Sequence, residues 1–177
     1  MRGLAVALVF LVVTASSGAA KPSDPWKQLR RPLHLPTLAA GEPCPVSDVR
    51  TRHGLAGALG ADPPYPLPFP QATLDLGRAK PRSDGRWAYA ARWLALPRFA
   101  GRVLIRSRRL DRPASVGFAK RAHGRRAAEL KLSFGRSRGW QTRGRAYLVV
   151  PSPGCYGFQV DGLDFSNTVV FQARLAP

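Results

Sequence analysis

The chain has 177 residues and a formal net charge of +18, because 28 lysines and arginines outnumber 10 aspartates and glutamates. This length fits one domain with a real hydrophobic core and excludes a second domain of full size. After the amino-terminal apolar run, no segment approaches the length of a membrane span, and no internal repeat indicates a solenoid or a propeller. The excess of positive charge favours anionic partners.

A cleavable signal peptide is predicted for residues 1–20. A short positive start precedes an apolar run at 4–13, and small side chains follow up to Ala20. We expect cleavage after Ala20, with Ala19 as the alternative position. The apolar run is about half of the roughly 20 residues that cross a bilayer, and an uncleaved anchor is the competing interpretation. The sequence therefore predicts a secreted or cell-envelope protein with no transmembrane segment after cleavage.

The mature chain begins with a proline-rich stretch at residues 21–43, which contains five prolines. Prolines at this density break any long helix, so the sequence predicts an extended arm. The arm also carries Trp26, Leu29, Leu33 and Leu35, whose side chains could pack it onto the domain as an edge strand or a wrapped tail.

Residues 44–177 are predicted to form one domain, which carries a second proline-rich segment at 61–72. Five prolines between Pro63 and Pro70 remove backbone donors and favour polyproline II geometry. This segment is therefore predicted to be a loop and not a central strand.

From Arg86 onward, the sequence alternates with the period of two that is typical of strands. Trp87, Tyr89, Ala91 and Trp93 share one side of the first run, which predicts that this side faces the core. Six more short runs have strand character, at residues 103–105, 116–118, 130–134, 146–150, 156–160 and 168–173. Seven short strands separated by turn residues predict an all-β fold, an immunoglobulin-like β-sandwich.

One segment allows a helix as an alternative, because residues 121–132 are rich in the helix formers Ala, Glu, Leu and Arg. Leu130, Leu132 and Phe134 alternate with polar residues, however. This spacing favours a loop that leads into a strand.

The two cysteines, Cys44 and Cys155, are predicted to form a disulfide, since an even count in an exported chain leaves no thiol over. A redox or metal-binding pair is the competing interpretation, but the cysteines lie far apart in sequence and form no Cys-x-x-Cys motif. A closed loop of about 100 residues contributes roughly 4.7 kcal/mol in the chain-entropy description.

The last third of the chain predicts a hairpin, with turn residues at 151–154, a strand from Cys155 and a reversal at 161–164. Tyr156, Phe158 and Val160 share one face of this strand, while Cys155, Gly157 and Gln159 share the other. If the aromatic face lies in the core, the disulfide must lie on the outer side of the sheet or at the end of the strand.

Two segments carry a family resemblance. They are Pro153-Gly154-Cys155-Tyr156 and the run Arg31-Pro32-Leu33-His34-Leu35-Pro36 with Pro43-Cys44-Pro45-Val46-Ser47. In these segments the chain resembles exported bacterial proteins of unknown function, from actinobacteria-like genomes, that have an immunoglobulin-like carboxyl-terminal part. The resemblance covers the two ends of the mature chain and implies a fold and a compartment. It implies no activity.

A search for catalytic chemistry finds three histidines, His34, His53 and His123, none at metal-ligand spacing with another. Asp161 and Asp164 could form a carboxylate pair for acid–base work or calcium binding. Turn formation, with the aspartates bonded to nearby backbone amides, is the favoured interpretation. No catalytic residue, metal ligand or cofactor is predicted.

The middle of the chain is strongly basic, with 15 lysines and arginines between Arg98 and Arg145 against Asp111 and Glu129. Eight of these residues flank or occupy predicted loops and form a candidate anion-binding set: Arg106, Arg108, Arg109, Arg112, Lys120, Arg121, Arg125 and Arg126. Their ligands would be teichoic acids, anionic lipid headgroups or extracellular DNA. The alternative is a solvated surface that reflects an arginine-rich, GC-rich genome. No motif indicates sequence-specific binding of nucleic acid.

These patterns favour a secreted, non-catalytic module that takes a structural or interaction role in the envelope, with an unknown protein or envelope polymer as partner. A nonspecific binder of polyanions, which would contact an anionic polymer or a membrane surface, is the first alternative. An enzyme with an unrecognised site is the second.

Overall fold

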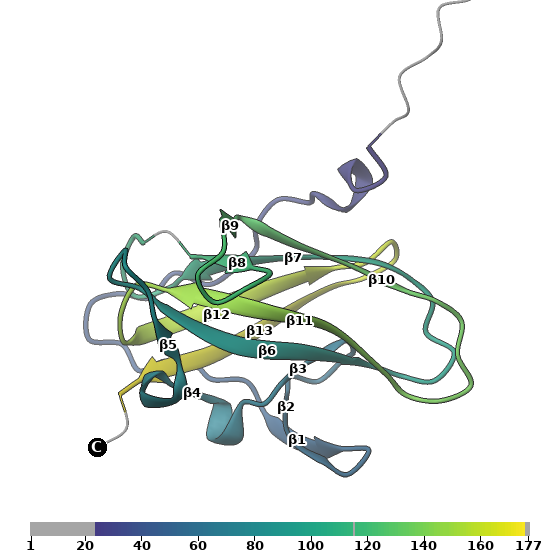
Figure 1. Cartoon of the computed structure of the whole chain (residues 1–177), viewed down its shortest axis with the longest axis horizontal. Helices are drawn as coiled ribbons and strands as arrows, with labels where there is room; N and C mark the ends of the chain where they lie inside the picture. The colour runs from purple at the N-terminus through teal and green to yellow at the C-terminus, as the bar shows by residue number, and fades with distance from the viewer. Residues whose placement is uncertain (1–23, 115, 176–177) are drawn as a thin grey trace, which may run out of the picture.

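The computed structural model describes residues 24–114 and 116–175, and it is an all-β sandwich (Figure 1). The expected signal peptide at 1–20 lies outside the described residues. Within those residues, no helix has the length and apolar character needed to cross a membrane. The predicted all-β class is confirmed.

One layer of the sandwich is a six-stranded sheet in the order β3-β6-β11-β8-β9, with β5 pairing β6 beside this path. Its pairs are antiparallel, and β6 and β11 share the longest register. The strands are β3 (Tyr65–Leu67), β5 (Lys80–Pro81), β6 (Trp87–Ala95), β8 (Gly117–Ala119), β9 (Arg126–Ala127) and β11 (Gln141–Val150).

The second layer is a five-stranded sheet in the order β10-β7-β12-β13-β4, which lies behind the first in Figure 1. All its pairs are antiparallel except β13 with β4, which is parallel. The strands are β4 (Thr73–Asp75), β7 (Gly101–Arg109), β10 (Glu129–Phe134), β12 (Gly154–Asp161) and β13 (Ser166–Arg174).

Smaller elements complete the chain. A separate antiparallel hairpin is made by β1 (Val49–Arg52) and β2 (Leu55–Leu59), at the lower side of Figure 1. Three single-turn 3-10 helices lie at Lys27–Leu29, Pro70–Ala72 and Leu76–Arg78.

The main core fills the space between the two sheets with the inward faces of their strands. Tyr89, Ala91 and Trp93 of β6 face it, as predicted from the period of two, and Trp87 packs against it partly buried. Trp93 meets Phe158 of β12 with ring centroids 5.3 Å apart in an edge-to-face arrangement. The predicted core side of the first strand is therefore confirmed.

All seven predicted strands occur, and the predicted helix alternative at 121–132 is absent, since β9 and β10 occupy part of that segment. Six short strands escaped the sequence pattern, and one of them corrects the prediction for 61–72. Tyr65–Leu67 pairs with β6 as the edge strand β3. Proline is compatible with this position because an edge strand has one side without ladder bonds.

The terminal hairpin lies where the sequence predicted it, with β12 and β13 paired from Gly154↔Ala173 to Asp161↔Ser166. Tyr156, Phe158 and Val160 lie in the main core. Cys155 lies on the opposite face, in a small apolar cluster with Leu35, Leu110 and Val170. The predicted two-faced character of this strand is confirmed.

Cys44 and Cys155 form the predicted disulfide, with a Cα–Cα distance of 5.5 Å. The bridge lies on the outer face of the five-stranded sheet, because Cys155 points away from the main core. It closes a loop of 111 residues in sequence separation. The disulfide therefore joins the end of the arm to the strand that precedes the last reversal.

The described part of the arm, residues 24–43, and the segment 44–48 that follows it wrap over the outer face of the five-stranded sheet. The amide of Leu38 donates to Leu110 O at 3.1 Å, and the amide of Ser47 donates to Val170 O at 2.9 Å. Leu35 is buried against Leu110. Of the two arrangements expected for the arm, the structure contains the wrapped tail.

Candidate functional site

The margin of the sandwich at β8, β9 and β10 carries a cleft, which we call the edge cleft. Figure 1 shows these strands along the upper side of the molecule. The edge cleft lies between β8 and β9 at the margin of one sheet and β10 at the margin of the other, and its volume is about 1150 Å³. The chain crosses from one sheet to the other at Ala128, which lies between β9 and β10. The lining residues come from the segments 118–121, 124–132 and from Ala146.

The floor of the edge cleft is apolar because it opens onto the main core. Phe118 of β8 and Leu132 of β10 are buried members of that core, and Leu130 packs against it partly buried. Ala127 and Ala128 are exposed where the chain crosses between the sheets. The accessible part of the floor therefore consists of Ala127, Ala128 and part of Leu130.

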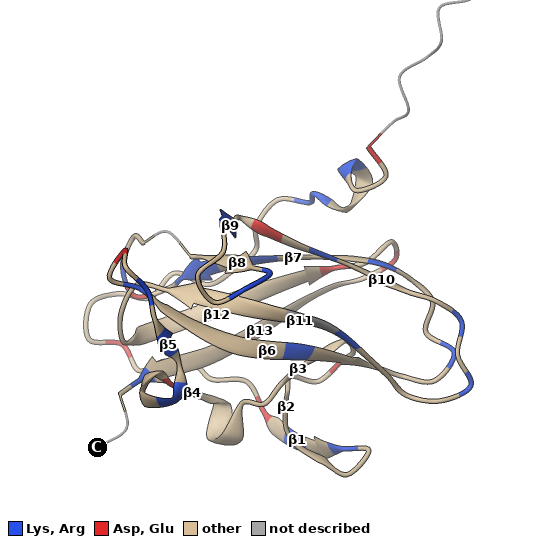
Figure 2. Cartoon of the chain, in the orientation of Figure 1, with Lys and Arg blue, Asp and Glu red and all other residues tan. Residues whose placement is uncertain are grey.

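The rim of the edge cleft is cationic. Lys120, Arg121 and Arg125 lie in the loop between β8 and β9, and all three are exposed. Across residues 24–114 and 116–175, no carboxylate forms an ion pair with any of these three side chains. Figure 2 shows this loop and β9 in blue at the upper part of the molecule. Arg126 lines the cleft as well, with its aliphatic stem packed over Gly117.

Buried contacts fix the loop that carries the rim, residues 120–125. Arg82 donates hydrogen bonds to the carbonyl oxygens of Ala122 and Gly124, the latter at 3.1 Å. Asp84 in turn binds Arg82 at 3.2 Å. Ala122 is buried on the outer face of the six-stranded sheet, in an apolar cluster with Val149. The loop is thus tied to the turn between β5 and β6, which positions the cations before any ligand arrives.

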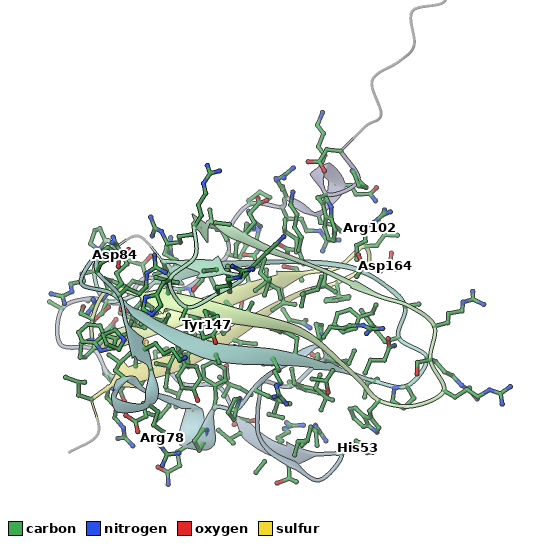
Figure 3. All side chains as sticks on the ribbon, in the orientation of Figure 1. His53, Arg78, Asp84, Arg102, Tyr147 and Asp164 are labelled. Atoms are coloured by element: carbon green, nitrogen blue, oxygen red, sulfur yellow. A yellow bond between two sulfur atoms is a disulfide. The ribbon has the colours of Figure 1, made fainter. Side chains whose placement is uncertain are left out.

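Figure 3 places Asp84, which binds Arg82, at the upper left of the molecule and Tyr147 nearer its centre, on the six-stranded sheet. Tyr147 is partly buried and packs against the same apolar cluster as Ala122. The loop is therefore held both by the hydrogen bonds from Arg82 and by the apolar packing of Ala122.

The edge cleft has one acidic lining residue, Glu129, and the arm neutralises it. Arg30 donates from Nε and Nη2 to the two carboxylate oxygens of Glu129 at 2.8 and 3.1 Å. The hydrogen bonds to Glu129 and, second, to Asp24 raise the pKa of Arg30 above its usual range. Lys131 lies 3.9 Å from the same carboxylate. Glu129 therefore adds little net negative charge to the cleft.

The other half of the predicted anion-binding set is bound to the protein itself. Arg108 donates to the carbonyl oxygens of Leu35 and Pro36 at 2.6 and 3.0 Å, which fastens the arm. Arg106 donates to Arg31 O and forms an ion pair with Asp161 at 2.7 Å. These two arginines lie under the arm and not on an open surface.

Arg109 and Arg112 lie at the other end of β7, near the turn at 151–154. Arg109 is buried and binds Asp111 at 2.6 Å, which raises the pKa of Arg109 and lowers the pKa of Asp111. Arg112 donates to Ser152 Oγ at 3.0 Å. The eight predicted residues therefore divide into a group held by internal contacts and a group at the edge cleft.

The two aspartates of the last reversal have separate surroundings. Asp161 is fully buried and accepts hydrogen bonds from Gln159 at 3.0 Å and Ser166 at 2.6 Å, besides its ion pair with Arg106. Asp164 is exposed and lines a second cavity of about 740 Å³. The reversal lies where predicted, but the Asp161 carboxylate binds side chains and not the turn amides.

The three histidines are also dispersed. His34 lies in the arm, where its backbone amide donates to Gln159 Oε1 at 2.6 Å. His53 stacks on Trp140 with ring centroids 5.2 Å apart. His123 is exposed in the rim loop. Figure 3 shows His53 on the lower side of the molecule, far from Arg102 and Asp164 on the upper right. Within residues 24–114 and 116–175, no group of three or more metal-ligating side chains occurs.

Sequence reasoning found the rim cations but missed the residues that hold them. Arg82 lies in a turn sequence, Pro81 to Arg86, that shows no sign of a contact 40 residues away. Arg30 and Glu129 are separated by 99 residues, and neither stands in a motif. These contacts become visible only in the three-dimensional structure, which brings the distant segments together.

Comparisons of the chain with protein families, curated proteins and solved structures found no match. The resemblance at Pro153-Gly154-Cys155-Tyr156 to exported bacterial proteins therefore stays a prediction.

Proposed function

We propose that this protein is an exported, non-catalytic binding module of the cell envelope, and that the edge cleft recognises an anionic envelope component. Export is supported by the signal-like amino terminus and by the disulfide, since such bonds persist in oxidising compartments. Binding is supported by the cleft, whose rim is positive and whose floor is apolar.

One observation carries the proposal: Lys120, Arg121 and Arg125 stand together on the rim with no internal carboxylate partner among the described residues. Elsewhere in the basic middle, Arg106, Arg108 and Arg109 are bound to internal acceptors. Genome composition explains an abundance of arginine, but it does not explain why unpaired cations gather at a cleft. An anion at this site would supply the missing partner.

The same residues favour binding without catalysis. Guanidinium and ammonium groups carry several hydrogen-bond donors and no acceptor. Such groups attract and orient an anion, but they cannot accept a proton as a general base near neutral pH.

Binding of inorganic polyphosphate to the full mature chain tests the proposal across a salt gradient. The triple variant Lys120→Glu, Arg121→Glu, Arg125→Glu should bind more weakly and reduce the slope of log affinity against log salt by about 3, because each lost phosphate contact removes about one unit. Fluorescence anisotropy of labelled polyphosphate gives both quantities.

A matched control reverses three exposed arginines away from the cleft: Arg92→Glu, Arg138→Glu and Arg174→Glu. This variant has the same net charge as the first. Equal losses in the two variants would mean that overall charge and not the edge cleft drives binding, and the proposal would then be wrong.

A further inference from the structure

The edge cleft places two kinds of surface in one hollow. Its rim carries Lys120, Arg121 and Arg125, while its floor exposes Ala127, Ala128 and part of Leu130. A purely ionic ligand such as a phosphate polymer would satisfy the rim and leave the floor in water. A ligand with an anionic head and an apolar chain matches both surfaces.

We infer that the edge cleft binds an anionic amphiphile, with a phosphate headgroup at the rim and an alkyl chain along the floor. The inference rests on the proposed function and specifies its ligand class. The head would contact Lys120, Arg121 and Arg125. The chain would lie on Ala127, Ala128 and Leu130, where it adjoins the main core.

The head site is organised in advance by the fold. Arg82 holds the loop through the carbonyl oxygens of Ala122 and Gly124, so the cations need little reordering on binding. Arginine also presents paired donors that match two oxygens of a phosphate. Glu129, the one acid among the lining residues, is bound by Arg30 and repels an incoming phosphate only weakly.

The chain site has the required size and polarity. The cleft volume of about 1150 Å³ is slightly larger than that of ordinary ligand sites, which span roughly 300–1,000 Å³, so it has room for a headgroup and an alkyl chain. Ala127 and Ala128 have small side chains at the crossing between the sheets, so an alkyl chain can reach the partly exposed Leu130. Each methylene that leaves water there adds to affinity.

Titration calorimetry with alkyl phosphates below their critical micelle concentration tests the inference on the full mature chain. Decyl phosphate should bind at least about tenfold more tightly than hexyl phosphate, since complete burial of the extra methylenes would give on the order of 200-fold. Inorganic phosphate should bind more weakly than either. Decyl maltoside, with the same chain and a neutral head, should also bind more weakly than decyl phosphate.

Two variants locate the binding. Ala128→Gln places a larger polar side chain on the floor and should remove the dependence on chain length while retaining polyphosphate binding. Ala56→Gln, at an exposed alanine of β2 outside the cleft, is the matched control and should behave like the original protein. Amide hydrogen exchange with decyl phosphate should show added protection at 117–132.

The outcomes separate the two proposals. Equal affinity for hexyl and decyl phosphate, with polyphosphate binding intact, would overturn the amphiphile and leave the anion site. Loss of binding to every anion would overturn both. Decyl phosphate binding that Ala128→Gln leaves unchanged, or protection at the second cavity instead of 117–132, would also overturn the inference. The inference would also be wrong if an extended acidic peptide competed with decyl phosphate and bound more tightly than it. That result would mean that a partner strand occupies the cleft.

Discussion

Arg109 gives a physical reason for the Pro153-Gly154-Cys155-Tyr156 sequence. Its guanidinium donates to Pro153 O at 2.6 Å and lies 5.5 Å from the ring centroid of Tyr156. It also lies against Gly154, where a Cβ atom would overlap the guanidinium group. Each residue of the motif except the disulfide cysteine therefore contacts this one arginine.

The packing at Gly154 leads to a prediction at the residue scale. Gly154→Ala should lower the free energy of unfolding by about 1–3 kcal/mol, because the Arg109 side chain is fixed by Asp111 and Ser152 and cannot withdraw without breaking those bonds. Urea unfolding followed by tryptophan fluorescence measures the change. Gly139→Ala is the control, since no atom lies within 4 Å of a Cβ there. Equal stability of the two variants would contradict the role given to Arg109.

At the scale of elements, the arm lies over two buried polar side chains of β12, Gln159 and Asp161, which we call the polar strip. Gln159 is fully buried, accepts from the amide of His34 at 2.6 Å and donates to Pro32 O at 2.9 Å. It also donates to Asp161 at 3.0 Å. These bonds replace the strand pairing that the prolines of the arm exclude.

The polar strip gives a prediction for the arm. Gln159→Leu should lower stability by about 2 kcal/mol, because it removes partners from backbone groups of the arm and from buried Asp161. Hydrogen exchange should show faster exchange at His34 and unchanged protection in β6 and β11. Gln172→Leu, at an exposed glutamine of β13, should change neither quantity. Unchanged exchange at His34 would mean that other contacts hold this part of the arm.

An element could be predicted where its own residues carry the pattern, and it was missed where only its neighbours in the sheet define it. The period of two revealed β6 and both faces of β12, because each strand carries its own alternation. Strands β3, β5 and β9 have two or three residues, which is too short for a period to show, and they pair only because β6 and β8 are beside them. The prolines that predict the arm are a local signal. The sheet that the arm covers is formed by residues far away in the sequence, so it could not be predicted from them.

The candidate site shows the same division. A run of cations at 120–126 is visible in the sequence, and so is the apolar alternation of β10. That β10 and β8 border one cleft follows only from the order of strands in two sheets. The internal use of Arg106 and Arg108 was invisible as well, since their acceptors are backbone carbonyls of the arm.

At the scale of the whole molecule, the disulfide joins segments 111 residues apart. The double variant Cys44→Ala, Cys155→Ala should lose up to about 4.7 kcal/mol of stability, because the unfolded chain regains the entropy of an open loop. Chemical unfolding of the variant beside the oxidised protein gives this difference.

The variant should retain the far-ultraviolet circular dichroism of the sandwich, since the main core lies on the other face of β12 from the bridge. Loss of that spectrum at low denaturant would show that the core depends on the bridge for folding. An unchanged unfolding midpoint would show that the arm is held by its hydrogen bonds alone.

The arm is made early in synthesis but packs on strands that are made late. A ribosome makes the arm before any strand of the sheet that it covers, and β12 and β13 come last. Leu35 meets Leu110, and Ser47 meets Val170, only after nearly the whole chain has emerged. The arm is thus made before the strands that it packs on, and the disulfide between Cys44 and Cys155 can form only after β12 has been made.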